Sequence, residues 1–206
     1  MQDGFVKVAA RTPEVRVADV EYNLTSCLRQ IDAAAKDGAC VIVLPELCVT
    51  AYTCEDLFWQ DALLNTAEKA VGTIAQRTSR IDALVLLGTP VRANAKLYNC
   101  AIALAHGRVL GIVPKQAIPN YNEFYEFRHF SVGPESCVPV DFAGFSGVPF
   151  GTRQLFACSE LPQLVVAAEI CEDLWIPNPP STEHALAGAT LVCNLSASYA
   201  IGGKAD

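Results

Sequence analysis

Short runs of β-branched and apolar residues recur along the chain, and they predict buried strands. Two of these runs stand in the stretch AIALAHGRVLGIV, where His106, Gly107 and Arg108 join them, which predicts a β-hairpin. The runs read FVKVAA, CVIVL, ALVLLG, CAIALA, VLGIV, QLVVAAEI and ATLVCNL.

Two stretches between these runs place apolar residues at helical spacing. Within residues 20–35, apolar residues recur every three or four positions, and Gly38 follows as a stop signal. Apolar residues recur in the same way within residues 64–75, just before ALVLLG. Residues 119–152 are rich in Pro, Gly, Ser and aromatics with little periodicity, which predicts a long functional loop. Helices alternating with strands predict an α/β layered domain with a mixed sheet.

Composition narrows the function classes. A chain of 206 residues is read as one domain, and its net charge of -7 argues against a nucleic-acid partner. No apolar stretch reaches the ~20 residues that cross a bilayer, and the N-terminus has no secretion-signal pattern. The nine cysteines include no CxxC or Cys/His zinc spacing, which favours buried thiols in a reducing cytoplasm and no metal site.

The tetrapeptide CEDL occurs twice, beginning at Cys54 and at Cys171. The first copy is explained as a helix start, with Thr53 as N-cap and Asp56 closing a capping box. The second copy follows the apolar run LVVAA, and a strand end is where an α/β sheet presents reacting groups. A cysteine just after an apolar strand is still more often a small buried core residue than a nucleophile.

Glu46 and Lys115 also follow apolar runs, each after a proline. A charge at a buried strand end needs a partner, so the two could form a structural ion pair or join Cys171 in one site. In such a site Cys171 attacks, Glu46 is the base, and Lys115 stabilises an oxyanion. Lys115 would also lower the thiol pKa, against the opposing carboxylates of Glu172 and Asp173.

Three blocks carry a family resemblance: VIVLPEL, GIVPKQAIPNYNEFYEFRHF and VAAEICEDLW. Together they resemble the signature blocks of the nitrilase superfamily, whose Glu-Lys-Cys triad falls on Glu46, Lys115 and Cys171. YTCEDLF, PNYNEFYEFR and EICEDLW resemble most the N-terminal glutaminase domains of glutamine-dependent NAD synthetases. The implied fold is a four-layer αββα sandwich formed by two packed domains in a homo-oligomer, here incomplete at its C-terminus.

The resemblance also implies a reaction and further site residues. Cys171 would form a thioester with glutamine, and the released ammonia would serve ATP-dependent amidation of deamido-NAD. Glu123 would be an auxiliary catalytic carboxylate, although it could be an ordinary loop residue. Glutamine would be bound by the residues Tyr121, Glu172, Trp175, Ser198 and Lys204.

Residues 1–206 are expected to hold a truncated glutaminase domain, without the synthetase domain that follows it in the family. The glutaminase half needs no cofactor, and ATP and magnesium are implied only for that other domain. Two alternatives stay open. One is a stand-alone amidase, nitrilase or carbamoylase of the same superfamily, and the other is a non-catalytic interaction domain.

Overall fold

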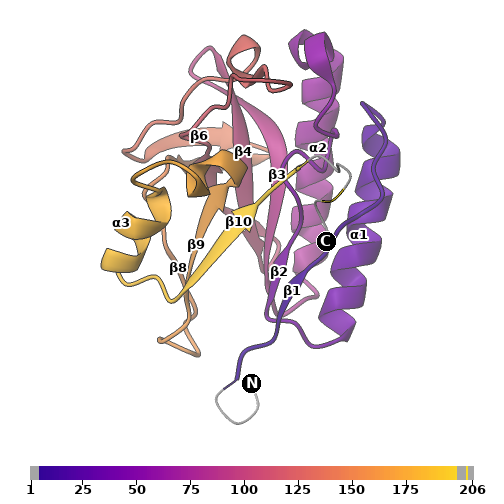
Figure 1. Ribbon diagram of the computed structural model, residues 1–206. Coiled ribbons are helices and arrows are strands. Elements are labelled where there is room, and N and C mark those ends of the chain that lie inside the picture. Colours follow the sequence, from indigo (N-terminus) through magenta and orange to yellow (C-terminus); the bar gives the residue numbers. More distant parts are fainter. Residues whose placement is uncertain (1–4, 199–202, 204–206) are drawn as a thin grey trace.

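The computed structural model describes residues 5–198 and 203, and its largest element is a seven-stranded mixed sheet (Figure 1). The strands lie in the order β1-β2-β3-β4-β5-β7-β6. Strands β1, β2 and β3 run parallel, whereas β3, β4 and β5 run antiparallel. Their bounds are Val8–Ala10 (β1), Val41–Val43 (β2), Leu84–Ala93 (β3), Lys96–Ala105 (β4), Arg108–Pro114 (β5), Val138–Phe142 (β6) and Phe145–Phe150 (β7).

A second sheet of three strands packs against the first, in the order β10-β9-β8. Its strands are Phe156–Ala157 (β8), Val165–Ile170 (β9) and Leu191–Leu195 (β10), with β9 and β10 parallel. Because strand side chains alternate, Val166 and Ile170 of β9 join the apolar cluster between the sheets, and Glu169 lies on the other face. That cluster unites Leu86 and Val113 of the large sheet with β9 and β10.

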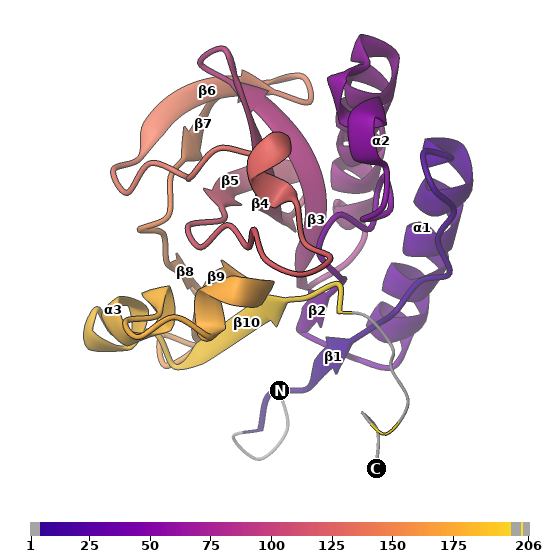
Figure 2. The same cartoon turned by 45° about the horizontal axis from the view of Figure 1, so that its top comes forward.

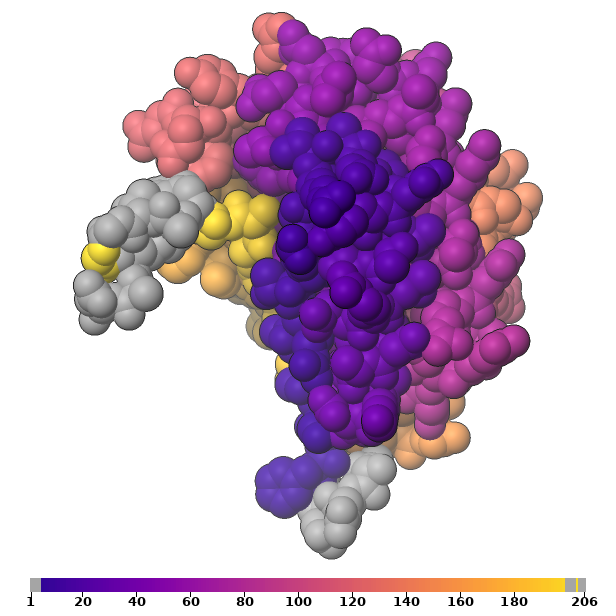
Figure 3. All heavy atoms as spheres, turned by 90° about the vertical axis from the view of Figure 1, so that its right-hand side faces the viewer, coloured from indigo at the N-terminus to yellow at the C-terminus, as the bar shows by residue number. Residues whose placement is uncertain are grey.

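Helices complete four layers. Helices α1 (Val20–Lys36) and α2 (Asp61–Thr78) cover the outer face of the large sheet, and α3 (Pro180–Leu186) lies outside the small sheet (Figures 1 and 2). Figure 3 shows the helical face, with the residues of α1 at its centre. The αββα arrangement therefore exists within this one chain, and the expectation that two packed domains form it is wrong.

Local signals explain α1. Asp19 caps its start by accepting a hydrogen bond from the Tyr22 N–H at 3.2 Å, and Ile31 is fully buried on the face toward the sheet. Gly38 follows the helix with φ +80°, a left-handed conformation that glycine adopts without strain. The helix and its stop were both predicted from the sequence and are confirmed, and so is the second predicted helix, within α2.

The hairpin between β4 and β5 is also confirmed, with His106 and Gly107 both at positive φ in the turn. Residues 119–152, predicted to be a loop, also contain the whole of β6 and β7. These strands were missed because Pro139, Gly147 and Pro149 interrupt their apolar pattern. The short strand β8 and helix α3 were missed too.

No helix in the described ranges is long and apolar enough to cross a membrane. All nine cysteines lie in those ranges and are free thiols. Cys100 and Cys193 are buried in the core, as expected for small apolar side chains.

Candidate active site

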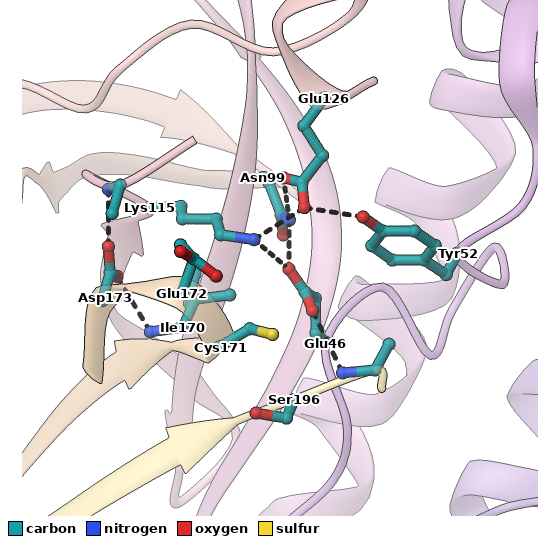
Figure 4. Close-up of polar contacts among 12 residues, drawn as sticks. Glu46, Tyr52, Asn99, Lys115, Glu126, Ile170, Cys171, Glu172, Asp173 and Ser196 are labelled. Carbon is teal, nitrogen blue, oxygen red and sulfur yellow. Dashed lines mark hydrogen bonds and ion pairs between the residues drawn. The ribbon is translucent and has the colours of Figure 1, made fainter. Parts of the chain in front are cut away.

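Three strand ends deliver a carboxylate, an ammonium group and a thiol to one cluster. Glu46 lies three residues after β2, Lys115 directly follows β5, and Cys171 directly follows β9. Figure 4 shows the Lys115 ammonium on the Glu46 carboxylate, with the Cys171 thiol pointing toward Glu46. The structure thus brings together the three residues that the sequence singled out.

Lys115 is completely buried and donates to two carboxylates. Its Nζ lies 2.7 Å from Oε1 of Glu46 and 2.7 Å from Oε1 of Glu126. The Asn99 Nδ2 donates to the same two groups, at 2.7 Å to Glu46 Oε1 and 3.2 Å to Glu126 Oε2. Burial lowers the pKa of Lys115, but both carboxylates outweigh it, so the net shift is upward and the group stays charged.

Glu126 occupies the place that was expected for Glu123. The backbone N–H of Glu126 bonds to the Pro119 carbonyl, and its side chain turns inward at the start of the 3₁₀ turn η2 (Glu126–Arg128). Glu123 is exposed and makes no ion pair with Lys115. Both glutamates stand in PNYNEFYEFR, and linear spacing from Lys115 could not tell which one the loop would bury.

Tyr52 approaches the cluster from the loop after Glu46. Its hydroxyl donates to Glu126 Oε1 at 2.8 Å. Burial raises the Tyr52 pKa, and the neighbouring Glu126 carboxylate raises it further, so the phenol keeps its proton. Sequence reasoning missed Tyr52 and Asn99, because neither lies next to a predicted site residue and a tyrosine after a strand end is an ordinary loop residue.

Cys171 opens the 3₁₀ turn η3 (Cys171–Leu174) with φ +46°, which a non-glycine residue adopts at a cost of roughly 1–3 kcal/mol. Burial raises its pKa to about 11, with Glu46 adding to the shift and Lys115 opposing it. Lys115 therefore lowers the thiol pKa, as expected, but burial and the Glu46 charge together raise it more. The resting thiol is neutral, and a base must take its proton when it attacks.

We expect alkylation of Cys171 by iodoacetamide to accelerate about tenfold per pH unit up to about pH 11, because the thiolate fraction sets the rate. Glu46→Gln removes a negative charge, so the thiol pKa should fall and alkylation at pH 8 should accelerate while amide hydrolysis falls. Mass spectrometry of the labelled Cys171 peptide measures both. A plateau below pH 8 in the unaltered protein would contradict the assignment.

Glu46 is placed by the close approach of its loop to β3. The Gly88 N–H donates to the Pro45 carbonyl at 3.1 Å, and the Gly88 carbonyl accepts from Val49 N at 3.3 Å. A Cβ on Gly88 would overlap the Leu47 nitrogen and lie 2.5 Å from the Glu46 Cα. Burial raises the pKa of Glu46, with Lys115 opposing, which makes the carboxylate a better base.

Gly88→Ala should displace Glu46, lowering turnover roughly 100-fold and the free energy of unfolding by about 1–3 kcal/mol. Steady-state kinetics and urea unfolding measure the two effects. Gly72→Ala in α2 is the control, because the nearest neighbour of its Cβ would be the Ala143 carbonyl oxygen at 3.1 Å, with other Ala143 atoms at 3.9 Å. Equal turnover in the two variants would show that the Gly88 contact does not position Glu46.

Only some of the residues expected to bind substrate lie together beside Cys171. The Tyr121 hydroxyl donates to Glu172 Oε2 at 2.8 Å, which joins two of them beside Cys171. Trp175 is 73% exposed just beyond η3, and Ser198 is exposed after β10. Lys204 lies outside the described residues. No group of three or more His, Cys, Asp or Glu within the described ranges is placed to hold a metal ion.

The cysteine of the first CEDL copy is a buried core residue. Cys54 is buried, and its Sγ contacts the Thr50 carbonyl oxygen at 3.0 Å. The capping box predicted there is wrong, because Cys54 rather than Thr53 precedes the 3₁₀ turn η1 (Glu55–Trp59) and no side chain caps it. Asp56 instead accepts two hydrogen bonds from Arg128, a bidentate charged contact that outcompetes a cap.

Known protein sequences match almost all of this chain. A family model described as carbon-nitrogen hydrolase matches residues 7–204. The glutamine-dependent NAD(+) synthetase of Mycobacterium tuberculosis is 41% identical over 205 residues, which cover 100% of this chain and 30% of the relative. The Homo sapiens protein of that name is 28% identical over 197 residues, 91% of this chain and 27% of the relative. This chain therefore spans less than a third of these relatives.

Solved structures agree with the fold. A glutamine-dependent NAD(+) synthetase from Cytophaga hutchinsonii superposes with a TM-score of 0.84 at 32% identity, over 97% of this chain and 32% of that one. An amidase from Nesterenkonia sp. superposes with a TM-score of 0.72 at 18% identity, over 100% of this chain and 70% of that one. The predicted nitrilase-like α/β fold is thereby confirmed.

Proposed function

Because this chain belongs to the carbon-nitrogen hydrolase family, we propose that it hydrolyses the side-chain amide of glutamine to glutamate and ammonia. The observation that carries the proposal is the buried ion pair of Lys115 and Glu46 beside the Cys171 thiol. These groups are a cation, a base and a nucleophile, which is the set that acyl transfer from an amide requires.

In the first half of the reaction Glu46 takes the proton of the Cys171 thiol as sulfur attacks the amide carbon. A base is needed because burial holds the thiol neutral at rest. Negative charge then develops on the carbonyl oxygen. Two of the three Lys115 N–H groups bond to carboxylates, which leaves the third to donate to this oxyanion.

Collapse of the tetrahedral intermediate expels the amine, and protonated Glu46 gives it the proton, so that ammonia leaves and a thioester remains. Glu46 then removes a proton from water, which attacks the thioester carbon. Glutamate departs and the sulfur regains its proton. Glu126 takes part by holding Lys115, whereas the family resemblance had suggested Glu123 as the auxiliary carboxylate.

The choice of glutamine rests on the names of the relatives and on one contact. The paired Tyr121 and Glu172 side chains offer a carboxylate and a phenol next to Cys171, a setting suited to the α-ammonium group of an amino acid. We assign both to glutamine binding, together with Trp175, Ser198 and Lys204 as the family resemblance implies.

Ammonia is the product that a linked reaction would use. We propose that a synthetase domain of a longer protein consumes it to amidate deamido-NAD, in keeping with the names of the relatives. ATP and magnesium would serve that domain, and no step of the hydrolysis above requires them.

A substrate comparison tests the proposal. The purified protein is given glutamine, asparagine, propionamide and propionitrile, and ammonia release is followed with a glutamate dehydrogenase assay. We expect turnover of glutamine and covalent labelling of Cys171 by a glutamine-mimicking diazoketone. A preference for propionamide or propionitrile would favour the stand-alone amidase or nitrilase alternative. Absence of both turnover and labelling would favour a non-catalytic interaction domain.

A further inference from the structure

Asp173 is a buried carboxylate that the mechanism above does not use. Its side chain follows Cys171 by two residues and is 2% exposed. Figure 4 shows it turned away from the Glu46 cluster, toward main-chain N–H groups. Burial raises its pKa to about 6, with three main-chain hydrogen bonds opposing, so the group is mostly ionised at neutral pH.

The contacts of Asp173 reach both sides of the site. Its Oδ1 accepts from the N–H groups of Gln116 at 3.0 Å and Ala117 at 2.7 Å, the two residues after Lys115. Its Oδ2 accepts from the N–H of Ile170 at 2.9 Å, the residue before Cys171. One carboxylate therefore ties the end of β5 in the large sheet to the end of β9 in the small sheet.

The hydrogen bonds of Asp173 lie next to a strained backbone position. Cys171 holds φ +46° between Ile170 and Asp173, and such a conformation persists only when its surroundings fix it. The bonds to Gln116 and Ala117 fix the segment that carries Lys115 relative to the same turn. An ionised carboxylate makes stronger bonds to N–H groups than a neutral amide does.

We propose that Asp173 is a positioning residue that fixes the Cys171 turn against the Lys115 strand end, and this rests on the proposed function. Its carboxylate touches no reacting atom in the mechanism. It sets the distance and direction between the nucleophile and the cation–base pair, which belong to different sheets. A misplacement near 1 Å costs on the order of 100-fold in rate.

The test compares Asp173→Asn with Ile74→Ala in the full-length protein. Asparagine keeps the size of the side chain but loses the charge and one acceptor. Ile74 is fully buried on α2, away from the site, so its variant reports the effect of lowered stability alone. Circular dichroism gives Tm, glutamine kinetics give kcat and KM, and iodoacetamide gives Cys171 reactivity.

We expect Asp173→Asn to lower kcat about 100-fold with KM changed less than about threefold, and to alter the Cys171 alkylation rate while the protein is fully folded. Ile74→Ala should change neither kcat nor the alkylation rate at temperatures below its Tm. A kcat and an alkylation rate for Asp173→Asn that match those of Ile74→Ala would overturn the proposal and leave Asp173 a purely structural role.

A second variant and a substrate-independent assay keep a failure to fold, and a failure of the proposed function, distinct from a failure of the Asp173 proposal. If Asp173→Asn does not fold, Asp173→Glu is used, because it retains the charge and displaces the carboxylate by one methylene. A folded Asp173→Glu protein with wild-type kcat and alkylation rate would overturn the proposal, and a loss of about tenfold or more supports it. Alkylation needs no glutamine, so failure of the unaltered protein to hydrolyse glutamine counts against the proposed function and not against Asp173.

Discussion

Cys171→Ala is expected to lower glutamine hydrolysis by roughly 10⁴-fold or more and to abolish diazoketone labelling, because it removes the proposed nucleophile that forms the thioester. The fold should survive, since Cys171 lies at a strand end and is only partly buried. Ammonia release, intact-protein mass spectrometry and circular dichroism measure the three quantities. A variant that retains turnover would contradict the assigned nucleophile.

The chain offers a matched control in Cys54→Ala. Cys54 begins the same tetrapeptide, is more deeply buried than Cys171, and lies outside the ion-pair cluster. Its replacement removes a sulfur from the core, so a small loss of stability is expected without loss of labelling. Diazoketone labelling at Cys54 instead of Cys171 would reverse the roles of the two copies.

Lys115→Met is expected to have the largest effect on stability as well as to remove activity. The ammonium group is fully buried between Glu46 and Glu126, and both carboxylates would lose their cation. Removing one partner of a buried ion pair costs roughly 3–5 kcal/mol of unfolding free energy, because uncompensated charge remains inside. Urea unfolding at pH 7 and glutamine kinetics measure the losses.

The pH dependence of this loss has a definite sign. Burial already raises the pKa of Glu46, and without the opposing Lys115 charge its folded-state pKa should lie well above its unfolded value. Groups with raised folded pKa values stabilise below the unfolded pKa and lose that contribution as pH rises through the folded pKa. The Lys115→Met protein should thus come closest to the wild type at about pH 4, near the unfolded glutamate pKa, and fall further behind as the pH rises.

Arg77→Ala is the control for that measurement. Arg77 pairs bidentately with Asp32 between α2 and α1, but both side chains are substantially solvent-exposed. Water screens such a pair, so its loss should change unfolding free energy little and turnover not at all. An equally small effect for Lys115→Met would show that the buried cluster contributes neither stability nor catalysis.

Strand ends were the most informative sequence feature. Apolar runs followed by Glu46, Lys115 and Cys171 predicted where polar groups emerge from the core, and these groups meet in the structure. The prediction worked because strand character is local, because β2 and β5 belong to one sheet, and because β9 of the second sheet packs against that sheet. The helices at residues 20–36 and 61–78 were predictable for the same reason, through apolar periodicity.

Loop residues were less predictable. PNYNEFYEFR contains Glu123 and Glu126, and only the fold of the loop around the Pro119 carbonyl decides that Glu126 turns inward. Asp173 was expected to affect the thiol pKa, whereas the structure places its carboxylate on main-chain N–H groups. In both cases contacts between residues distant in sequence set the side-chain direction.

The sequence by itself determined the strand and helix pattern, the α/β class and the three chemical groups offered at strand ends, because each depends on residues near one another in the chain. Only the tertiary structure decided that Glu126 is the second carboxylate, that the Cys171 thiol rests neutral, and that Asp173 joins the two sheets. Charge energies depend on burial and on distances between atoms, and packing fixes both across the whole chain.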